Sequence, residues 1–146
     1  MRWYFGLIVL SLSCSAYAGL YSDDLAKCLV ESTTKEDRTA LVRWMFAAAG
    51  SHPAVASIAN VSPHAMDEAN ASTGALFMRL LTDSCKDKAK RALAYEGPSA
   101  IQLSFQVLGQ VAAGELFSSP EVRAAMAGLQ QHVDNKKLEE LKNSPP

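Results

Sequence analysis

The sequence lacks the residue biases that mark several large classes of protein. Only 20% of its 146 residues are charged and 8% are aromatic, and the formal net charge is -1. Disordered chains combine a low apolar fraction with a high net charge, so the apolar content of 49% argues against disorder. Nucleic-acid-binding domains carry an excess of basic residues, which this chain does not have. The length is also too short for two domains of ordinary size.

The chain also lacks the period-two alternation of β-branched and polar residues that is typical of strands. Its apolar residues recur instead at spacings of three and four, as Leu25, Cys28 and Leu29 do, and this spacing places them on one face of a helix. The sequence therefore predicts an all-α fold, a compact bundle of five to seven helices that forms a single domain over residues 19–143.

The first eighteen residues have the features of an export signal. Arg2 supplies a positive charge, and the apolar run from Trp3 to Leu12 is too short to span a bilayer. Ala16-Tyr17-Ala18 has the small-x-small pattern that signal peptidase cleaves. We therefore expect cleavage after Ala18 and a periplasmic or secreted protein. After removal of residues 1–18, the sequence predicts no transmembrane segment.

Cysteine is scarce, and the three cysteines are distributed in an informative way. Cys14 lies within the leader, and lipid attachment there is disfavoured because Ser11 occupies the position where an apolar residue such as Leu is required. The remaining two, Cys28 and Cys85, are an even pair in an exported chain, which predicts one disulfide. Neither has a second cysteine nearby, so a redox CxxC site is not indicated.

Prolines suited to the first position of a helix mark several predicted helix starts. The pairs are His52-Pro53, Ser62-Pro63 and Ser119-Pro120, and Glu96-Gly97-Pro98 is the clearest stop signal in the chain. Thr33 and Glu36 have the spacing of a capping box at the start of a helix that ends near Ala49, with Gly50 as the first residue beyond it. The helix from Pro63 continues to residue 95 either as one helix or, as we favour, with a break near Asp83-Ser84.

The last predicted helix has an apolar stripe that we expect to face the core. Its members are Val122, Ala125, Met126, Leu129 and Val133. The chain then becomes strongly charged from Asp134 onward, and residues 144–146 are predicted to be a frayed tail.

One group of residues could bind a metal ion. His64, Asp67 and Glu68 lie at i, i+3 and i+4 at the start of a predicted helix, and nitrogen and carboxylate oxygen atoms on one helix face can coordinate Zn²⁺. The alternative is that the acids complement the helix dipole. No HExxH or GxSxG motif accompanies them, so catalysis is not favoured and no cofactor is predicted.

Two further features point to binding rather than catalysis. Arg43 interrupts an apolar helical segment and shares a face with small residues, so its guanidinium could reach a carboxylate, a phosphate or a partner chain; its ordinary role would be a pair with an acid such as Glu36. Gln102, Gln106 and Gln110 form an i, i+4, i+8 row on a helix without charge. Uncharged amides suit a protein contact surface or an internal amide network.

The chain resembles an uncharacterised set of small exported helical proteins of Gram-negative bacteria. The residues that carry the resemblance are Thr33-Thr34-x-x-Asp37-Arg38-x-x-Leu41-Val42-Arg43-Trp44-Met45-Phe46, His52-Pro53, Leu76–Leu81, Cys85 and Leu108-Gly109-x-Val111-Ala112. The resemblance implies a periplasmic helical domain and supplies no catalytic residue.

The sequence thus leaves three functions open. We favour a periplasmic protein-binding or accessory module without catalysis, with a periplasmic protein as its partner and no nucleic acid. A small metal-dependent enzyme or hydrolase around His64, Asp67 and Glu68 is one alternative. A chaperone-like helical protein that holds clients on an apolar surface is the other, and the oligomeric state stays open.

Overall fold

The computed structural model describes residues 19–144, and all of its regular structure is helical, with no strand in that range. The predicted leader, with Cys14 and the cleavage position, and the last two residues of the predicted tail lie outside the described residues. The elements are α1 (Leu20–Glu31), α2 (Lys35–Gly50), α3 (Pro53–Ala59), α4 (Pro63–Arg79), a π-helical turn (Leu80–Ser84), α5 (Lys86–Glu96), α6 (Pro98–Phe117), α7 (Pro120–Ala127), a 3₁₀ turn (Gly128–His132) and α8 (Asn135–Asn143). The described residues therefore contain eight α-helices, slightly more than the predicted five to seven.

Four helices begin at the prolines that the sequence singles out. Pro53, Pro63, Pro98 and Pro120 each stand at the first helical position, where the missing N–H costs nothing because that group has no partner inside the helix. The break predicted near Asp83-Ser84 is also confirmed, since the π-helical turn separates α4 from α5 there.

Two local predictions were displaced by one residue. The capping box of α2 uses Thr34 and Asp37 rather than Thr33 and Glu36, because the Thr33 hydroxyl donates to Val30 O at 2.8 Å instead. Gly50 is the last residue of α2 and not the first beyond it. Glycine suits that position because a Cβ there would lie 2.8 Å from Val61 Cγ2, so only glycine allows the α3–α4 connection to approach α2 this closely.

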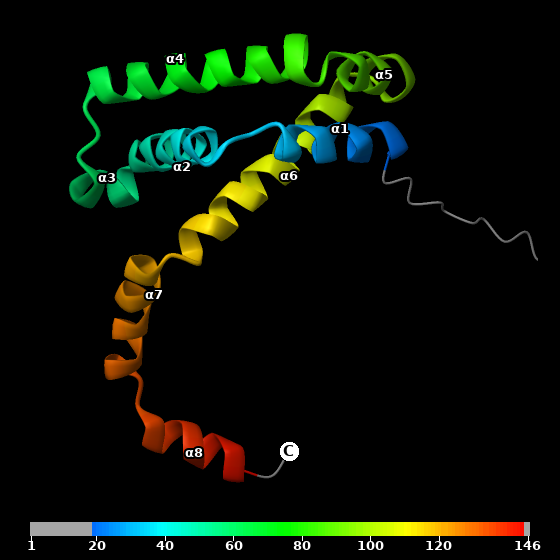
Figure 1. Cartoon of the computed structure of the whole chain (residues 1–146). Coiled ribbons are helices and arrows are strands. Elements are labelled where there is room, and N and C mark those ends of the chain that lie inside the picture. The colour runs from blue at the N-terminus through cyan, green and yellow to red at the C-terminus, as the bar shows by residue number, and fades with distance from the viewer. Residues whose placement is uncertain (1–18, 145–146) are drawn as a thin grey trace, which may run out of the picture.

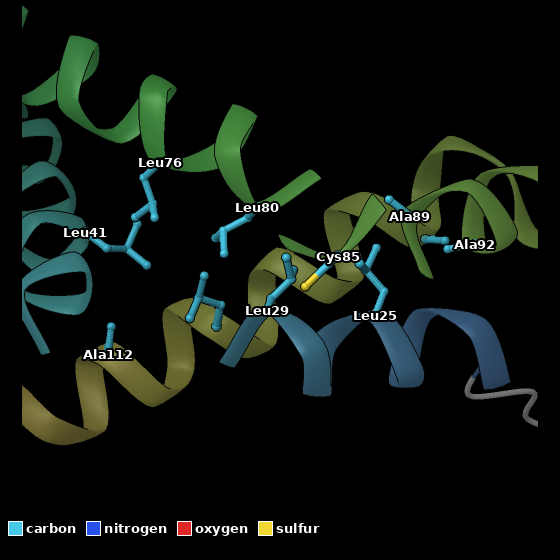
Figure 2. Close-up of a cluster of buried hydrophobic side chains, with 11 residues drawn as sticks. Leu25, Leu29, Leu41, Leu76, Leu80, Cys85, Ala89, Ala92 and Ala112 are labelled. Carbon is cyan, nitrogen blue, oxygen red and sulfur yellow. The ribbon is translucent and has the colours of Figure 1, made fainter. Parts of the chain in front are cut away.

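The core lies among α1, α2, α4, α5 and α6, and Figure 2 shows its side chains converging from these helices. Between α2 and α4, Leu41 and Leu76 point toward one another, and Leu25 and Leu29 of α1 lie near Cys85. Five of the eleven core residues, four alanines and one cysteine, have small side chains, which let helix backbones approach closely while burying little area each. The buried residues are Leu25, Leu29, Leu41, Leu76, Leu80, Cys85, Ala89, Ala92, Ala100, Leu108 and Ala112.

The predicted disulfide is present and joins α1 to the end of the π-helical turn. Cys28 and Cys85 are bonded, and their Cα atoms are 6.0 Å apart. The turn sets the position of Cys85, whose amide donates to Leu80 O at 2.8 Å, five residues back. The extra residue in the turn thus helps to place the Cys85 sulfur against α1.

A carboxylate from α5 caps the first helix. Glu96 accepts hydrogen bonds from the amides of Tyr21 at 2.8 Å and Ser22 at 3.0 Å, which are among the N–H groups that have no partner within α1. Burial raises the pKa of Glu96, but these two hydrogen bonds outweigh it and hold that pKa below its ordinary value. Gly19 makes the contact feasible, because a Cβ at that position would overlap the Glu96 carboxylate.

The C-terminal segment departs from the predicted compact bundle. Figure 1 shows α7 and α8 leading away from the other helices. Neither helix contains a buried residue, α7 packs only on α6 and the adjoining 3₁₀ turn, and α8 packs on no other element of the described chain. We call residues 118–143 the C-terminal arm.

The stripe expected to face the core therefore lies outside it. Met126 and Leu129 are exposed, as are Val133 and two leucines of α8, Leu138 and Leu141. The predicted single helix is also too long, because α7 ends at Ala127 and Leu129 lies in the 3₁₀ turn. The periodicity carries no information on what the apolar face meets. In this fold α6 is already covered by α1, α2 and α5, and the turn at Ser118-Ser119-Pro120 directs the arm away from them.

Candidate functional site

An open apolar groove of about 820 Å³ lies between α2 and α4 and is bordered at one end by the junction of α6 with α7. Figure 1 shows α2 and α4 running side by side, with α3 joining them. The lining is mostly apolar, with one cation and one carboxylate. Its residues are Ala40, Val42, Arg43, Phe46, Ala47, Asn60, Val61, Ser62, Ala65, Glu68, Ala69, Ser72, Leu116, Phe117 and Val122. We call this surface the α2–α4 groove.

Small side chains of two helices contribute to the lining of the groove. Ala40 and Ala47 lie on α2, and Ala65 and Ala69 lie on α4. Alanine at these four lining positions leaves space that leucine-sized side chains would fill. Larger apolar side chains, Phe46 and Phe117 among them, stand on the walls instead.

Polar contacts between helices hold the walls at a fixed separation. Arg79 of α4 donates to Asp37 of α2 at 2.7 Å, and Arg38 of α2 donates to Glu115 of α6 at 2.7 Å. Burial raises the pKa of Asp37, but the Thr34 amide and Arg79 outweigh it and lower that pKa below its usual value. The carboxylate is therefore ionised at neutral pH, and this tie between α2 and α4 stays intact.

Aromatic packing among α2, α4 and α6 adds to this rigidity. The Phe77 and Phe105 rings lie 4.1 Å apart between their centroids, which joins α4 to α6. Trp44 of α2 meets Phe77 edge-on at 6.3 Å and donates from its indole nitrogen to Asn70 at 2.9 Å. The groove is therefore built on helices that are fastened to one another, and it requires little ordering on binding.

Arg43 is one of two predicted site residues that line the groove, and Glu68 is the other. The Arg43 side chain lines the groove together with Ala40 and Ala47, the small neighbours that its helical face predicts. The alternative pair with Glu36 is not formed, and Arg43 makes no ion pair or side-chain hydrogen bond within residues 19–144. The groove thus offers a guanidinium without a counter-ion beside an apolar surface, which suits a ligand carboxylate.

The three predicted metal ligands are not gathered into a site. His64 Nδ1 and Glu68 Oε2 are 3.5 Å apart, on side chains that are 83% and 71% exposed. Asp67 is also exposed. Across residues 19–144 no group of three or more His, Cys, Asp or Glu side chains is arranged to hold a metal ion. Of the three, only Glu68 reaches the groove, where it is the single acidic lining residue.

The glutamine row lies on a different surface. Gln102, Gln106 and Gln110 are all exposed on α6, so the internal amide network that we considered does not occur. Leu103 and Val107, on the same helix, are exposed beside them. None of the three glutamines lines the α2–α4 groove, so the predicted binding residues fall on two separate faces.

Phe46 and Phe117 are groove residues that we did not predict as site residues. Phe46 is 64% exposed and Phe117 is 56% exposed, which is unusual for phenylalanine. The sequence contained a hint of the role of Phe46, because the apolar residues of its helix cover more than one face. One face packs on the core and the other is left for the groove.

Comparison of the chain with protein-family models, with curated proteins and with solved structures finds no match. The resemblance to small exported helical proteins of Gram-negative bacteria therefore stays a prediction. Within the described residues no helix combines the length and the apolarity needed to cross a membrane.

Proposed function

We propose that the protein is a periplasmic binding module without catalysis, and that its α2–α4 groove holds an amphipathic helix of a partner protein. The observation that carries the proposal is the groove itself, a hollow of about 820 Å³ with a mostly apolar lining and one uncompensated guanidinium. Helix-in-groove recognition uses such surfaces, with apolar anchors spaced three and four residues apart on the incoming helix.

The lining defines the chemistry of the partner. Phe46 and Phe117 supply exposed aromatic surface, and aromatic side chains are enriched in the cores of protein interfaces. Arg43 calls for a carboxylate at the edge of the incoming apolar stripe. Because Arg43 is exposed, its pair contributes only about 1 kcal/mol or less, and its role is to fix the orientation of the helix.

Two features support the periplasmic assignment. The leader predicted over residues 1–18 would direct export, and the Cys28–Cys85 disulfide suits an oxidising compartment.

A chaperone-like role is a second candidate, favoured by the exposed apolar residues of the C-terminal arm. The two functions differ in selectivity, since a chaperone protects many unfolded clients and a binding module retains one folded partner. Suppression of the aggregation of a chemically denatured client by the purified protein would favour the chaperone role. No observation in the described residues favours the metal-dependent enzyme or hydrolase.

Affinity capture from periplasmic extract tests the proposal with matched variants. Ala65→Glu places a charge in the groove, whereas Ala71→Glu places the same charge on an exposed part of α4 that does not line it. Glutamate keeps a high helix propensity at both positions. We expect wild type and Ala71→Glu to retain the same protein, and Ala65→Glu and Arg43→Glu to lose it. Equal capture by all four chains, or by none, would contradict the proposal.

A further inference from the structure

The last helix of the chain carries two leucines that no other element of the described chain covers. Leu138 and Leu141 are 52% and 72% exposed, and because they are three residues apart they share one face of α8. Every residue of α8 is exposed, and the helix packs on no other element of residues 19–144. The fold therefore leaves this leucine face open to another surface.

The charged residues of α8 are arranged symmetrically about the leucine face. At 100° per residue, Lys137 and Lys142 lie about 70° to either side of the midpoint between the two leucines. Glu139 and Glu140 lie about 130° to either side of it, on the opposite half of the helix. The helix thus combines an apolar face, a cation along each border of that face, and acids on the side away from it.

We propose that α8 is an interfacial helix, which lies in the plane of a bilayer that contains anionic phospholipid and attaches the protein to the membrane surface. Amphipathic helices of this kind bury one apolar face at the boundary between headgroups and acyl chains. Lysines at the borders bury their methylene stems and extend their ammonium groups to the lipid phosphates. The inference concerns a surface other than the α2–α4 groove and goes beyond the proposed function.

The charge pattern favours a planar anionic surface over a protein partner. A plane meets both borders of the leucine face at once and repels carboxylates, and α8 has a cation on each border and its acids on the half that stays in water. Two leucines also cover far less than the roughly 800 Å² per partner that a stable protein interface buries. Contact with lipid needs no matching shape and adds attraction between lysine and phosphate.

The test is co-sedimentation of the mature chain, residues 19–146, with vesicles of phosphatidylcholine alone and with vesicles of equal parts phosphatidylcholine and phosphatidylglycerol. We expect binding to the anionic vesicles to be tighter by at least about 5-fold and to weaken as salt is added. Leu138→Gln with Leu141→Gln should lower that binding about 10- to 100-fold without changing the charge. Leu20→Gln with Leu103→Gln, at leucines that are 67% and 53% exposed on α1 and α6, is the matched control and should bind as wild type does.

Single lysine variants test the cationic borders. Lys142→Gln removes a charge at the edge of the leucine face and should weaken binding to the anionic vesicles about 5-fold. Lys136→Gln removes the same charge from the far side of the helix, about 170° from the midpoint of the leucines, and should weaken binding by less than about 2-fold. Lys142 is a better choice than Lys137, whose ammonium also lies 3.9 Å from the Asp134 carboxylate.

Tryptophan placed in α8 reports which face enters the bilayer. Lipids brominated on their acyl chains should quench the fluorescence of Leu141→Trp and leave that of Lys136→Trp unchanged, once the signal of Trp44 measured in wild type is subtracted. All of the substituted positions are exposed, so the fold should persist, and circular dichroism checks the helix content of each variant.

Three results would overturn the inference. They are failure of wild type to bind the anionic vesicles, equal binding to the two kinds of vesicle, and equal binding by the leucine variant and its control. Capture of a protein through the arm by a chain that binds no vesicles would also overturn it, in favour of a protein partner. Ala65→Glu should bind vesicles as wild type does, so failure of the groove to bind a partner would leave this inference standing.

Discussion

Loss of the Cys28–Cys85 disulfide should remove a large part of the stability of this small helical body. The bond joins residues 57 positions apart, and in the chain-entropy description closing such a loop in the unfolded chain contributes about 4 kcal/mol. Domains of this size are stable by only about 5–15 kcal/mol. An unfolding entropy of about 2.1 cal/mol/K per residue converts the loss into a fall of roughly 15 °C in Tm.

The assay is denaturant and thermal unfolding of the Cys28→Ala, Cys85→Ala double variant beside wild type, each with and without reductant. Cys85 is buried, so alanine also removes some packing, and reduced wild type isolates the effect of the bond alone. We expect reductant to bring wild type close to the double variant and to leave the double variant unchanged. A difference below about 1 kcal/mol between oxidised and reduced wild type would refute the loop-entropy argument.

Three smaller changes test other parts of the fold. Leu108 is fully buried in the core, so Leu108→Ala should lower the free energy of unfolding by about 3 kcal/mol in urea titrations. The Thr73 hydroxyl is buried and has no hydrogen-bond partner among residues 19–144. Thr73→Val should therefore raise stability by up to about 1 kcal/mol, and a clear loss would show that the hydroxyl has a partner. The pKa of Glu96 is lower in the folded chain than in the unfolded chain. The ionised carboxylate therefore stabilises the fold at pH values above the unfolded pKa, and this stabilisation is lost as the pH falls through the folded pKa. Glu96→Gln should therefore unfold more readily at neutral pH and show a smaller loss of stability in acid than wild type, and parallel pH profiles would contradict the capping role.

The sequence predicts the helices well because their limits depend on local chemistry. Proline at a first helical position restricts φ whatever the rest of the chain does, and an even pair of cysteines in an exported chain predicts a disulfide. The capping box was misplaced by one residue because Thr33 and Thr34 are chemically equivalent as caps. Only the contact of Thr33 with Val30 O decides between them.

The arm and the groove could not be predicted in the same way. The stripe through Met126 and Leu129 is that of a core-facing helix, and only the packing of α6 shows that no core surface is left for it. Arg43 was identified because it interrupts an apolar helix. The groove beside it depends on alanines of α2 and α4, which the tertiary fold and no local pattern brings to one surface.

Photo-cross-linking from position 46 in living cells tests the central claim, that the α2–α4 groove is a binding surface for a helix. A benzophenone side chain in place of Phe46 would lie on the groove wall, and one in place of Ile58, which is 83% exposed and does not line the groove, is the matched control. We predict that position 46 forms a discrete cross-linked product with a helical segment, that position 58 does not, and that Ala65→Glu abolishes the product. Cross-linking that is equal from the two positions, or that Ala65→Glu leaves unchanged, would contradict the account.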